Sequence, residues 1–262
     1  MQNWSERNLR RAVWLTVMFW ISVLLFSLGI CGVGLLLNLP IWVPPLAGLM
    51  ILAVVVRISG NAERRLLERC GETEPESGNY PRITNLVDAL CLTTGVSAPE
   101  IRVLRSSASN IAAIGRSPDK STLILTTGLI ESVSRVALEA VLANRIAQIT
   151  NYRVALTTTT LTTFGLTLGS TRIRIWPLLP LGLLSGGRLA KGPDLDSDFS
   201  DDAAGVTVTR YPPGMVEALE ILENQHQVAG TDAHTSPLWL LDPSNGAERP
   251  SVQARIASLR EM

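Results

Sequence analysis

Three polar residues, Asn144, Arg145 and Gln148, are the first candidates for chemistry in this chain. They lie within residues 138–154, where apolar residues recur at helical spacing and predict an amphipathic helix with one buried face. Asn144 and Gln148 are four residues apart and are therefore neighbours on this helix, while Arg145 projects from the middle of the apolar arc. Buried polar groups require partners, and a buried charge requires one most of all. We therefore expect these three side chains to be paired.

Residues 138–151, LEAVLANRIAQITN, resemble the helix LxAVLAHELAHIxNxD of the HtpX-like membrane zinc metallopeptidases. In that motif two histidines at i and i+4 bind Zn²⁺, and the glutamate between them is the general base. The resemblance places Asn144 at the first histidine, Arg145 at the glutamate and Gln148 at the second histidine. The alternative is an ordinary amphipathic helix with a chance match.

These three replacements remove the chemistry of the motif. Amide oxygens are weak, neutral ligands for Zn²⁺, which prefers imidazole, thiolate and carboxylate. A guanidinium cannot accept a proton at any working pH, and it would repel a divalent cation. We therefore expect no metal and no catalytic residue on this helix. The two histidines, His226 and His234, stand in no recognisable motif and are interpreted as surface loop residues.

Two segments before this helix resemble the edge strand of the same family. Residues 110–115 (NIAAIG) resemble NAFATG, and residues 122–129 (TLILTTGL) resemble VxVTxGLL. In that family a peptide substrate is laid along this strand, and edge strands recognise peptides through backbone hydrogen bonds whatever the metal does. A plain structural strand is the alternative. The residues of the implied peptide-binding edge are Asn110, Gly115, Ile124, Leu125 and Thr126.

Residues 194–202, DLDSDFSDD, form an acidic run. An EF-hand loop is excluded, because Phe199 stands where glycine is required and Gly205 where the bidentate glutamate is required. The second half of the run, DFSDDA, instead resembles the family's EFxADA, in which the glutamate is the third zinc ligand. Asp198 takes that position with a side chain one methylene shorter, and Asp202 matches the following aspartate.

Two later segments complete the resemblance. Residues 209–215 resemble TRxPxGL, and residues 249–256 resemble the closing HPxxxxRI, with Arg249 in place of the histidine. Without a metal, the charge of Asp198 would be uncompensated, and Arg145 is a cation on the facing helix. We therefore predict that an ion pair between Arg145 and Asp198 replaces the metal. The alternative is that Arg145 reaches solvent or lipid headgroups.

The composition limits the classes of protein. The chain has 262 residues, enough for one medium domain with membrane anchors. Its net charge of zero gives no indication of nucleic-acid binding. Its mean hydropathy is positive, which is unusual for a wholly soluble protein. Cys31, Cys70 and Cys91 are far apart, show no CxxC spacing and are predicted to be free thiols.

Residues 12–56 contain no charged residue, a length sufficient for two membrane spans. We predict spans at about 13–37 and 41–56, with a tight turn between them. The length of the apolar run and the second span exclude a secretory signal peptide. Basic residues flank the hairpin on both outer sides, so the positive-inside rule predicts that both termini are cytoplasmic. These residues are Arg7, Arg10, Arg11, Arg57, Arg64, Arg65 and Arg69.

The chain thus divides into a transmembrane hairpin (1–57), a basic segment and linker (58–79) and a peptidase-like domain (80–262). Within the domain, residues 155–187 form a candidate membrane-associated insertion. The resemblance implies an α+β fold that is mainly helical and zincin-like, with a small β-sheet and the N-terminal hairpin as its anchor.

The resemblance further implies a pseudopeptidase in the cell (inner) membrane, with its main domain in the cytoplasm. Its role would be binding or regulation of a peptide or a membrane protein, without a cofactor. Its partners would be the lipid bilayer and a second protein, and not nucleic acid. One alternative is an active metalloendopeptidase or hydrolase with an atypical site, and another is a structural subunit of a membrane complex.

Overall fold

A computed structural model describes residues 2–76, 78–164, 197–231, 233–244 and 249–262. Its helices and strands are α1 (Gln2–Leu36), α2 (Val43–Gly60), α3 (Ala62–Arg69), β1 (Thr73–Pro75), α4 (Pro81–Thr94), β2 (Glu100–Leu104), β3 (Ile111–Ser117), β4 (Lys120–Thr126), α5 (Thr127–Ser132), α6 (Arg135–Thr150), α7 (Arg153–Phe164), α9 (Ser197–Thr209), α10 (Pro212–Gln225), the 3₁₀ helix η1 (Ala233–Leu238) and α11 (Val252–Arg260). The predicted insertion at 155–187 begins within α7, and its part from residue 165 onward lies outside the described residues.

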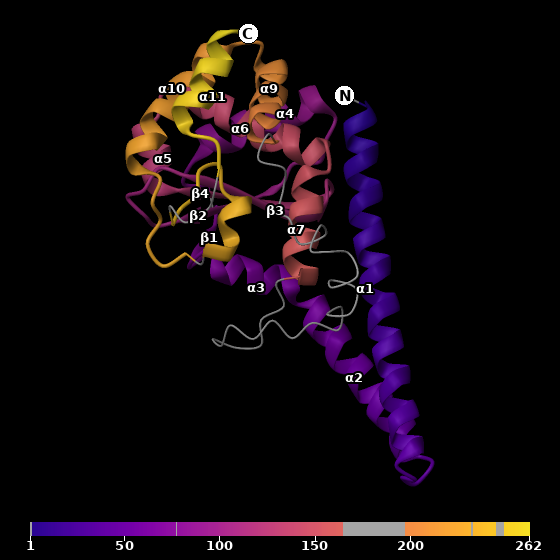
Figure 1. The fold of residues 1–262 in the computed structure, drawn as a ribbon. Helices are drawn as coiled ribbons and strands as arrows, with labels where there is room; N and C mark the ends of the chain where they lie inside the picture. Colours follow the sequence, from indigo (N-terminus) through magenta and orange to yellow (C-terminus); the bar gives the residue numbers. More distant parts are fainter. Residues whose placement is uncertain (1, 77, 165–196, 232, 245–248) are drawn as a thin grey trace.

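The helices α1 and α2 form a hairpin that projects from the rest of the molecule (Figure 1). Each is long and apolar enough to cross a membrane, with mean hydropathies of 2.3 and 1.9. In the most apolar 18-residue stretch of each helix, only 22% and 11% is buried inside the structure, whereas the core helix of a soluble protein is mostly buried. The two predicted apolar helices are therefore present. α1 extends beyond the predicted span to Gln2, and in this polar extension Asn8 Nδ2 donates to the carbonyl of Asn151 (2.9 Å).

The two hairpin helices are closest near their connecting turn and diverge toward the domain (Figure 1). At Gly48 of α2, an added Cβ would lie 2.8 Å from Ser27 Oγ and 3.0 Å from Cys31 Sγ of α1. The Ser27 hydroxyl also donates to the carbonyl of Gly48 (3.1 Å). Small residues permit such close contact between membrane helices. The side chains of Phe19 and Val23 fill the contact nearer the domain.

The sheet has four strands in the order β1-β2-β4-β3. β2 pairs in parallel with β4, while β1 and β3 are antiparallel to their neighbours. Gly115 is required near the β3–β4 turn, because a Cβ there would lie 2.6 Å from the carbonyl oxygen of Lys120.

Successive residues of β3 face two different cores. Ile111 and Ala113 belong to the larger core, together with side chains from α4, α6, α10 and α11. Ala112 and Ile114 belong to a smaller core that includes α3 and Trp239. This alternation is the two-residue period of a strand buried on both faces. Figure 1 shows α6, α10 and α11 on one side of the sheet and α3 on the other.

α6 runs through the larger core in contact with α4, α7, α9 and α10. It starts at an N-cap in which the Ser134 hydroxyl accepts from the backbone N–H of Ala137 (3.1 Å). The chain leaves it through Tyr152, which adopts a left-handed conformation (φ 56°) and turns into α7. The sequence predicted one buried face, but α6 is buried on nearly all sides. Its polar residues are therefore interior, and the mainly helical α+β fold is confirmed.

Candidate functional site

The three polar residues of α6 form a hydrogen-bonded chain inside the protein. Asn144, Arg145 and Gln148 are 0%, 3% and 7% exposed. Gln148 Nε2 donates to Asn144 Oδ1 (3.1 Å), and Arg145 Nη1 donates to Gln148 Oε1 (3.0 Å). Each amide oxygen thus accepts a hydrogen bond from its neighbour on the same helix. Side chains at i, i+3 and i, i+4, which stand at the positions of a metal-binding motif, are here hydrogen-bonded to one another.

α9 lies against α6 at Asn144 because Gly205 allows close approach. An added Cβ at Gly205 would be 2.6 Å from Asn144 Cα. One helical turn earlier, Asp202 Oδ1 accepts a hydrogen bond from Asn144 Nδ2 (2.9 Å). Both Asp202 oxygens also accept from Arg255 of α11, from Nε and Nη2 at 2.7 Å each. The two side chains are each 2% exposed, so this is a bidentate, desolvated ion pair.

A second bidentate pair joins Asp198, at the start of α9, to Arg249. Arg249 Nη2 and Nε donate to the two Asp198 oxygens at 2.8 and 3.0 Å. Arg249 also donates to the carbonyls of Trp239 (3.0 Å) and Leu240 (3.1 Å). Although burial alone would raise the pKa of Asp198, the hydrogen bonds from Arg249 hold it below its ordinary value.

The predicted ion pair between Arg145 and Asp198 is therefore wrong in its cation. Arg249, which the resemblance placed at the family's closing histidine, occupies both oxygens of Asp198 instead. Arg145 bonds only to Gln148 among the described residues, and its buried Nε has no hydrogen-bond partner there. Arg145 does come close enough to Asp198 to be stabilised by its charge. The alternative of Arg145 reaching solvent is also wrong, because the side chain is buried.

The charges around Arg145 shift two pKa values. Burial, together with the nearby cations Arg249 and Arg255, lowers the pKa of Arg145 to about 10, against the opposing charge of Asp201. The guanidinium still carries its proton at neutral pH. Burial raises the pKa of Asp201 to about 6, against the effect of Arg153, whose Nε lies 3.7 Å from its carboxylate.

These residues do not fit Zn²⁺. The carboxylate oxygens of Asp198 and Asp202 are held by two guanidinium groups, and a third, that of Arg145, is close enough to Asp198 and Asp201 to interact with their charges. The amide oxygens of Asn144 and Gln148 are weak ligands that already accept hydrogen bonds. In the part of the chain that the structure describes, no group of three or more His, Cys, Asp or Glu could hold a metal ion. Among the described residues, the side chains at the positions of the motif's two histidines and glutamate are thus amides and a guanidinium that are hydrogen-bonded to one another.

The predicted peptide-binding edge is closed by the chain itself. The outer side of β3 pairs with residues 239–240, through a bridge between Ala112 and Trp239 and a 2.9 Å hydrogen bond from Leu240 N to Ile111 O. Further along, the N–H of Gly115 donates to Thr158 Oγ1 of α7 (3.1 Å). A peptide would have to displace both contacts to pair with β3. Pairing on the outer side of β3 is favourable, because a free edge strand would leave its backbone groups unpaired.

The other residues of that predicted edge are structural. Ile124 and Leu125 lie on β4, an inner strand, and are 0% exposed. Thr126 caps α5, where its hydroxyl accepts from Leu129 N. Asn110 Nδ2 donates to the carbonyls of His226 and Leu241, at 2.9 Å each. The alternative of a plain structural strand therefore describes this segment better than a binding edge.

The remaining candidate groups lie outside this network. His226 lies at the C-terminal end of α10, where Nδ1 is 3.1 Å from the carbonyl of Leu222. The side chain of His234 lies outside the described residues. All three cysteines are free thiols, as predicted. Burial raises the pKa of the Cys70 thiol to about 12, so that this thiol is a poor nucleophile.

Sequence reasoning gave no role to Arg153, Asp201 or Arg255. One signal was present: an acidic run of three aspartates at positions 198, 201 and 202, entering a buried site, requires an equal number of cations nearby. The structure supplies them from α7, from residue 249 and from α11.

Comparison with known proteins gives the family. No family model matches the chain. A protease HtpX homolog of Dictyoglomus turgidum is 30% identical over 226 residues, covering 75% of this chain and 74% of the relative. That of Dictyoglomus thermophilum is 29% identical and covers 97% and 92%, and that of Limosilactobacillus reuteri is 25% identical and covers 98% of both. With an α+β domain behind two apolar helices, and with relatives that match it along nearly its whole length, the chain belongs to the family of HtpX protease homologues.

Proposed function

We propose that this chain is a membrane-anchored HtpX homologue that does not cleave peptides and acts by binding another membrane protein. The observation that carries the proposal is the network around α6. The side chains at the positions of the zinc ligands and the general base are hydrogen-bonded to one another and to Asp202. The carboxylate at the position of the third ligand is held by Arg249. Each group that would have to bind metal or accept a proton is already engaged.

Two features favour a structural role in a membrane complex over peptide holding in the former cleft. The outer edge of β3 is paired internally, so the backbone groups that would bind a peptide are occupied. The hairpin, by contrast, presents large apolar side chains over most of its length, which lipid or another membrane helix can cover. Examples are Leu25, Phe26, Leu28, Leu46 and Leu49, each at least half exposed.

We further infer that both termini and the domain face the cytoplasm from the inner membrane. The described arginines before α1's apolar part and after α2 bracket the hairpin, and none lies in the turn between the two helices. This orientation is tested by cysteine labelling, on a chain whose own three cysteines are replaced by serine. A single cysteine is introduced either at Leu37, in the turn, or at Leu92, on α4. Labelling is then compared between intact cells and opened membranes. Labelling of Leu37→Cys alone in intact cells is expected, and labelling of Leu92→Cys alone would contradict the inference.

The proposed lack of hydrolysis is tested by metal content and cleavage together. The full chain is purified in detergent, dialysed against trace zinc, analysed for metal and incubated with an unfolded protein substrate. We expect substoichiometric zinc and no cleavage that a chelator abolishes. Stoichiometric zinc, with cleavage lost both on chelation and in Asp198→Ala, would refute the proposal and establish an active hydrolase with an atypical site. A Glu220→Ala variant, altered at an exposed carboxylate of α10, is the matched control.

A further inference from the structure

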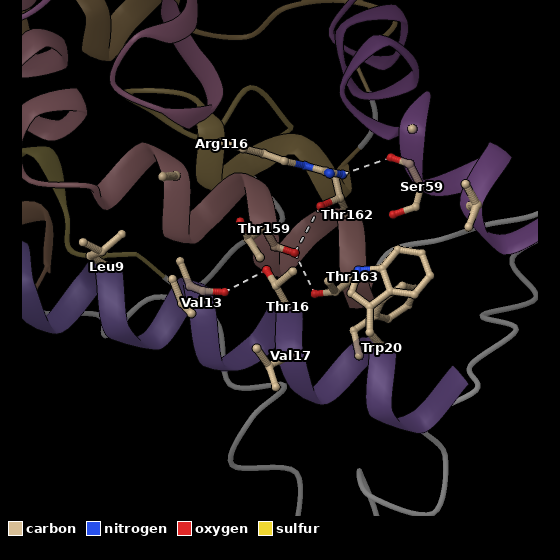
Figure 2. A pocket seen from close by; sticks show the side chains of 15 residues that line it. Leu9, Val13, Thr16, Val17, Trp20, Ser59, Arg116, Thr159, Thr162 and Thr163 are labelled. Carbon is tan, nitrogen blue, oxygen red and sulfur yellow. Dashed lines mark hydrogen bonds between the residues drawn. The ribbon is translucent and has the colours of Figure 1, made fainter. Parts of the chain in front are cut away.

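A pocket of about 470 Å³ lies where the hairpin meets the domain. Its walls come from α1, from the last turn of α2, from α7 and from the end of β3 (Figure 2). It opens where α1 and α2 have diverged, with Val13, Val17 and Trp20 on one wall and Val56 on another. Phe19 and Trp20, packed edge to face with ring centroids 5.4 Å apart, lie at its α1 side. Sites that bind small molecules typically have volumes of about 300–1,000 Å³, a range that includes this pocket.

The polar residues on these walls leave few open hydrogen-bonding groups. The hydroxyl of Thr16 donates to the carbonyl of Ala12 in its own helix (2.9 Å). On α7, Thr162 and Thr163 likewise donate to carbonyls one turn earlier, at 2.8 and 2.6 Å. Such back-bonding satisfies a threonine hydroxyl within its helix. These three bonds each lie within one helix, so an apolar occupant would displace none of them (Figure 2).

Among the described residues that line the pocket, Arg116 is the one that carries a charge. It reaches to the end of α2, where Nη2 donates to the carbonyl of Ser59 (3.3 Å) and Nε lies 3.6 Å from the Glu63 carboxylate (Figure 2). Its side chain remains 40% exposed, so further N–H groups can still bind an anion. α2 ends at Gly60, so Arg116 lies level with the domain-side end of this apolar helix.

We propose that this pocket holds one phospholipid from the leaflet on the domain side of the bilayer. An acyl chain would lie between α1 and α7, and the phosphate would lie against Arg116. Three observations carry the proposal: the pocket borders two helices apolar enough to span a membrane, the hydroxyls of Thr16, Thr162 and Thr163 on its walls are satisfied within their own helices, and a guanidinium stands at its rim. Apolar cavities take up apolar molecules rather than water, and a guanidinium matches a phosphate in charge and geometry.

The occupant can be identified by photo-crosslinking in the membrane. The full chain carries p-benzoylphenylalanine in place of Val17, which lines the pocket, or in place of Val33, which lies exposed on the same helix outside it. After illumination of native membranes, the mass of the purified chain is measured. We expect a phospholipid adduct at Val17 in clear excess over that at Val33. A dominant adduct at Val17 with another protein, or with residues 165–196 of the chain itself, would overturn the proposal, as would equal lipid adducts at both positions.

The contribution of Arg116 is tested by native mass spectrometry of the full chain released from vesicles of phosphatidylglycerol. Retention of one lipid is expected for the parent and for Arg105→Gln, which alters another exposed arginine paired with a glutamate (Glu74). A loss of about tenfold is expected for Arg116→Gln, which corresponds to one charge-assisted hydrogen bond. Vesicles containing diacylglycerol, which lacks the phosphate, should give no retained lipid. Equal retention by the two variants, or of diacylglycerol, would refute recognition of the phosphate.

Discussion

The buried pair between Arg255 and Asp202 offers the sharpest test of the network. In Arg255→Met, the apolar replacement keeps much of the side-chain volume but removes the cation. Asp202 then loses two hydrogen bonds of 2.7 Å and retains the 2.9 Å bond from Asn144. The carbonyl of Leu240 loses its 3.1 Å bond from Arg255 as well. A buried carboxylate is left without its counter-charge.

The expected loss of stability follows from that burial. Breaking one side of a buried ion pair costs about 3–5 kcal/mol, because the remaining charge stays desolvated. For a chain of this size about 1 kcal/mol shifts the midpoint by roughly 2–4 °C, so we expect Tm to fall by roughly 6–20 °C. Removing both charges in Arg255→Met with Asp202→Asn should recover much of this loss, since no unpaired ion remains.

The assay is thermal unfolding of the full chain in detergent, followed by intrinsic fluorescence. Arg260→Met is the matched control, because it lies on the same helix and pairs at 3.0 Å with Glu220, but its side chain is 65% exposed. Exposed pairs contribute at most about 1 kcal/mol, so this control should unfold close to the parent.

Two results would refute the reasoning. If Arg255→Met unfolds at the same temperature as Arg260→Met, the pair does not hold α9 to α11. If the double variant with Asp202→Asn loses the sum of the two single losses, the two residues act independently and the network is not coupled.

Two further predictions concern α9. Asp201 has a pKa of about 6 in the folded protein against an ordinary value of 3.8, so the folded state binds its proton first, and stability should rise as pH falls from about 7 to about 4. At pH 7.5 the free energy of unfolding of Asp201→Asn should exceed that of the parent by up to about 3 kcal/mol. An unchanged pH dependence of Tm in that variant would contradict the assignment. Gly205→Ala should destabilise the protein by at least about 1–3 kcal/mol, because its Cβ would lie 2.6 Å from Asn144 Cα. The control Gly60→Ala has open space around its Cβ and should be nearly neutral. Equal unfolding temperatures for these two variants would show that α9 does not pack closely against α6 at Gly205.

Local properties of the sequence sufficed for much of the fold. An uncharged run broken at Asn38–Pro40 predicts a hairpin of apolar helices, because chain length and side-chain transfer into lipid depend on composition alone. The helical spacing around residues 138–154 predicts α6 for the same reason. The types of the residues at positions 144, 145 and 148 also predict that these three positions supply neither strong zinc ligands nor a base, wherever the helix lies in the fold.

Contacts between distant segments could be decided only by the tertiary structure. Four arginines, at positions 145, 153, 249 and 255, lie near the aspartates of α9, and the sequence offers no means to choose among them. In the folded protein, α9 approaches α6 at Gly205, and the chain before α11 passes near the start of α9. As a result Asp198 pairs with Arg249 and Asp202 pairs with Arg255, while Arg145 is hydrogen-bonded to Gln148.

The closed edge of β3 has the same origin. A strand at the edge of a sheet looks the same in the sequence whether its outer backbone groups are free or paired. Here they are paired by Trp239 and Leu240, more than a hundred residues further along the chain, and by a side chain of α7. Pairing of this kind depends on where the whole chain places its segments, while residue types and periodicity act within a few residues. The sequence therefore determined which residue types stand at the motif positions, and the tertiary structure decided which partners they contact.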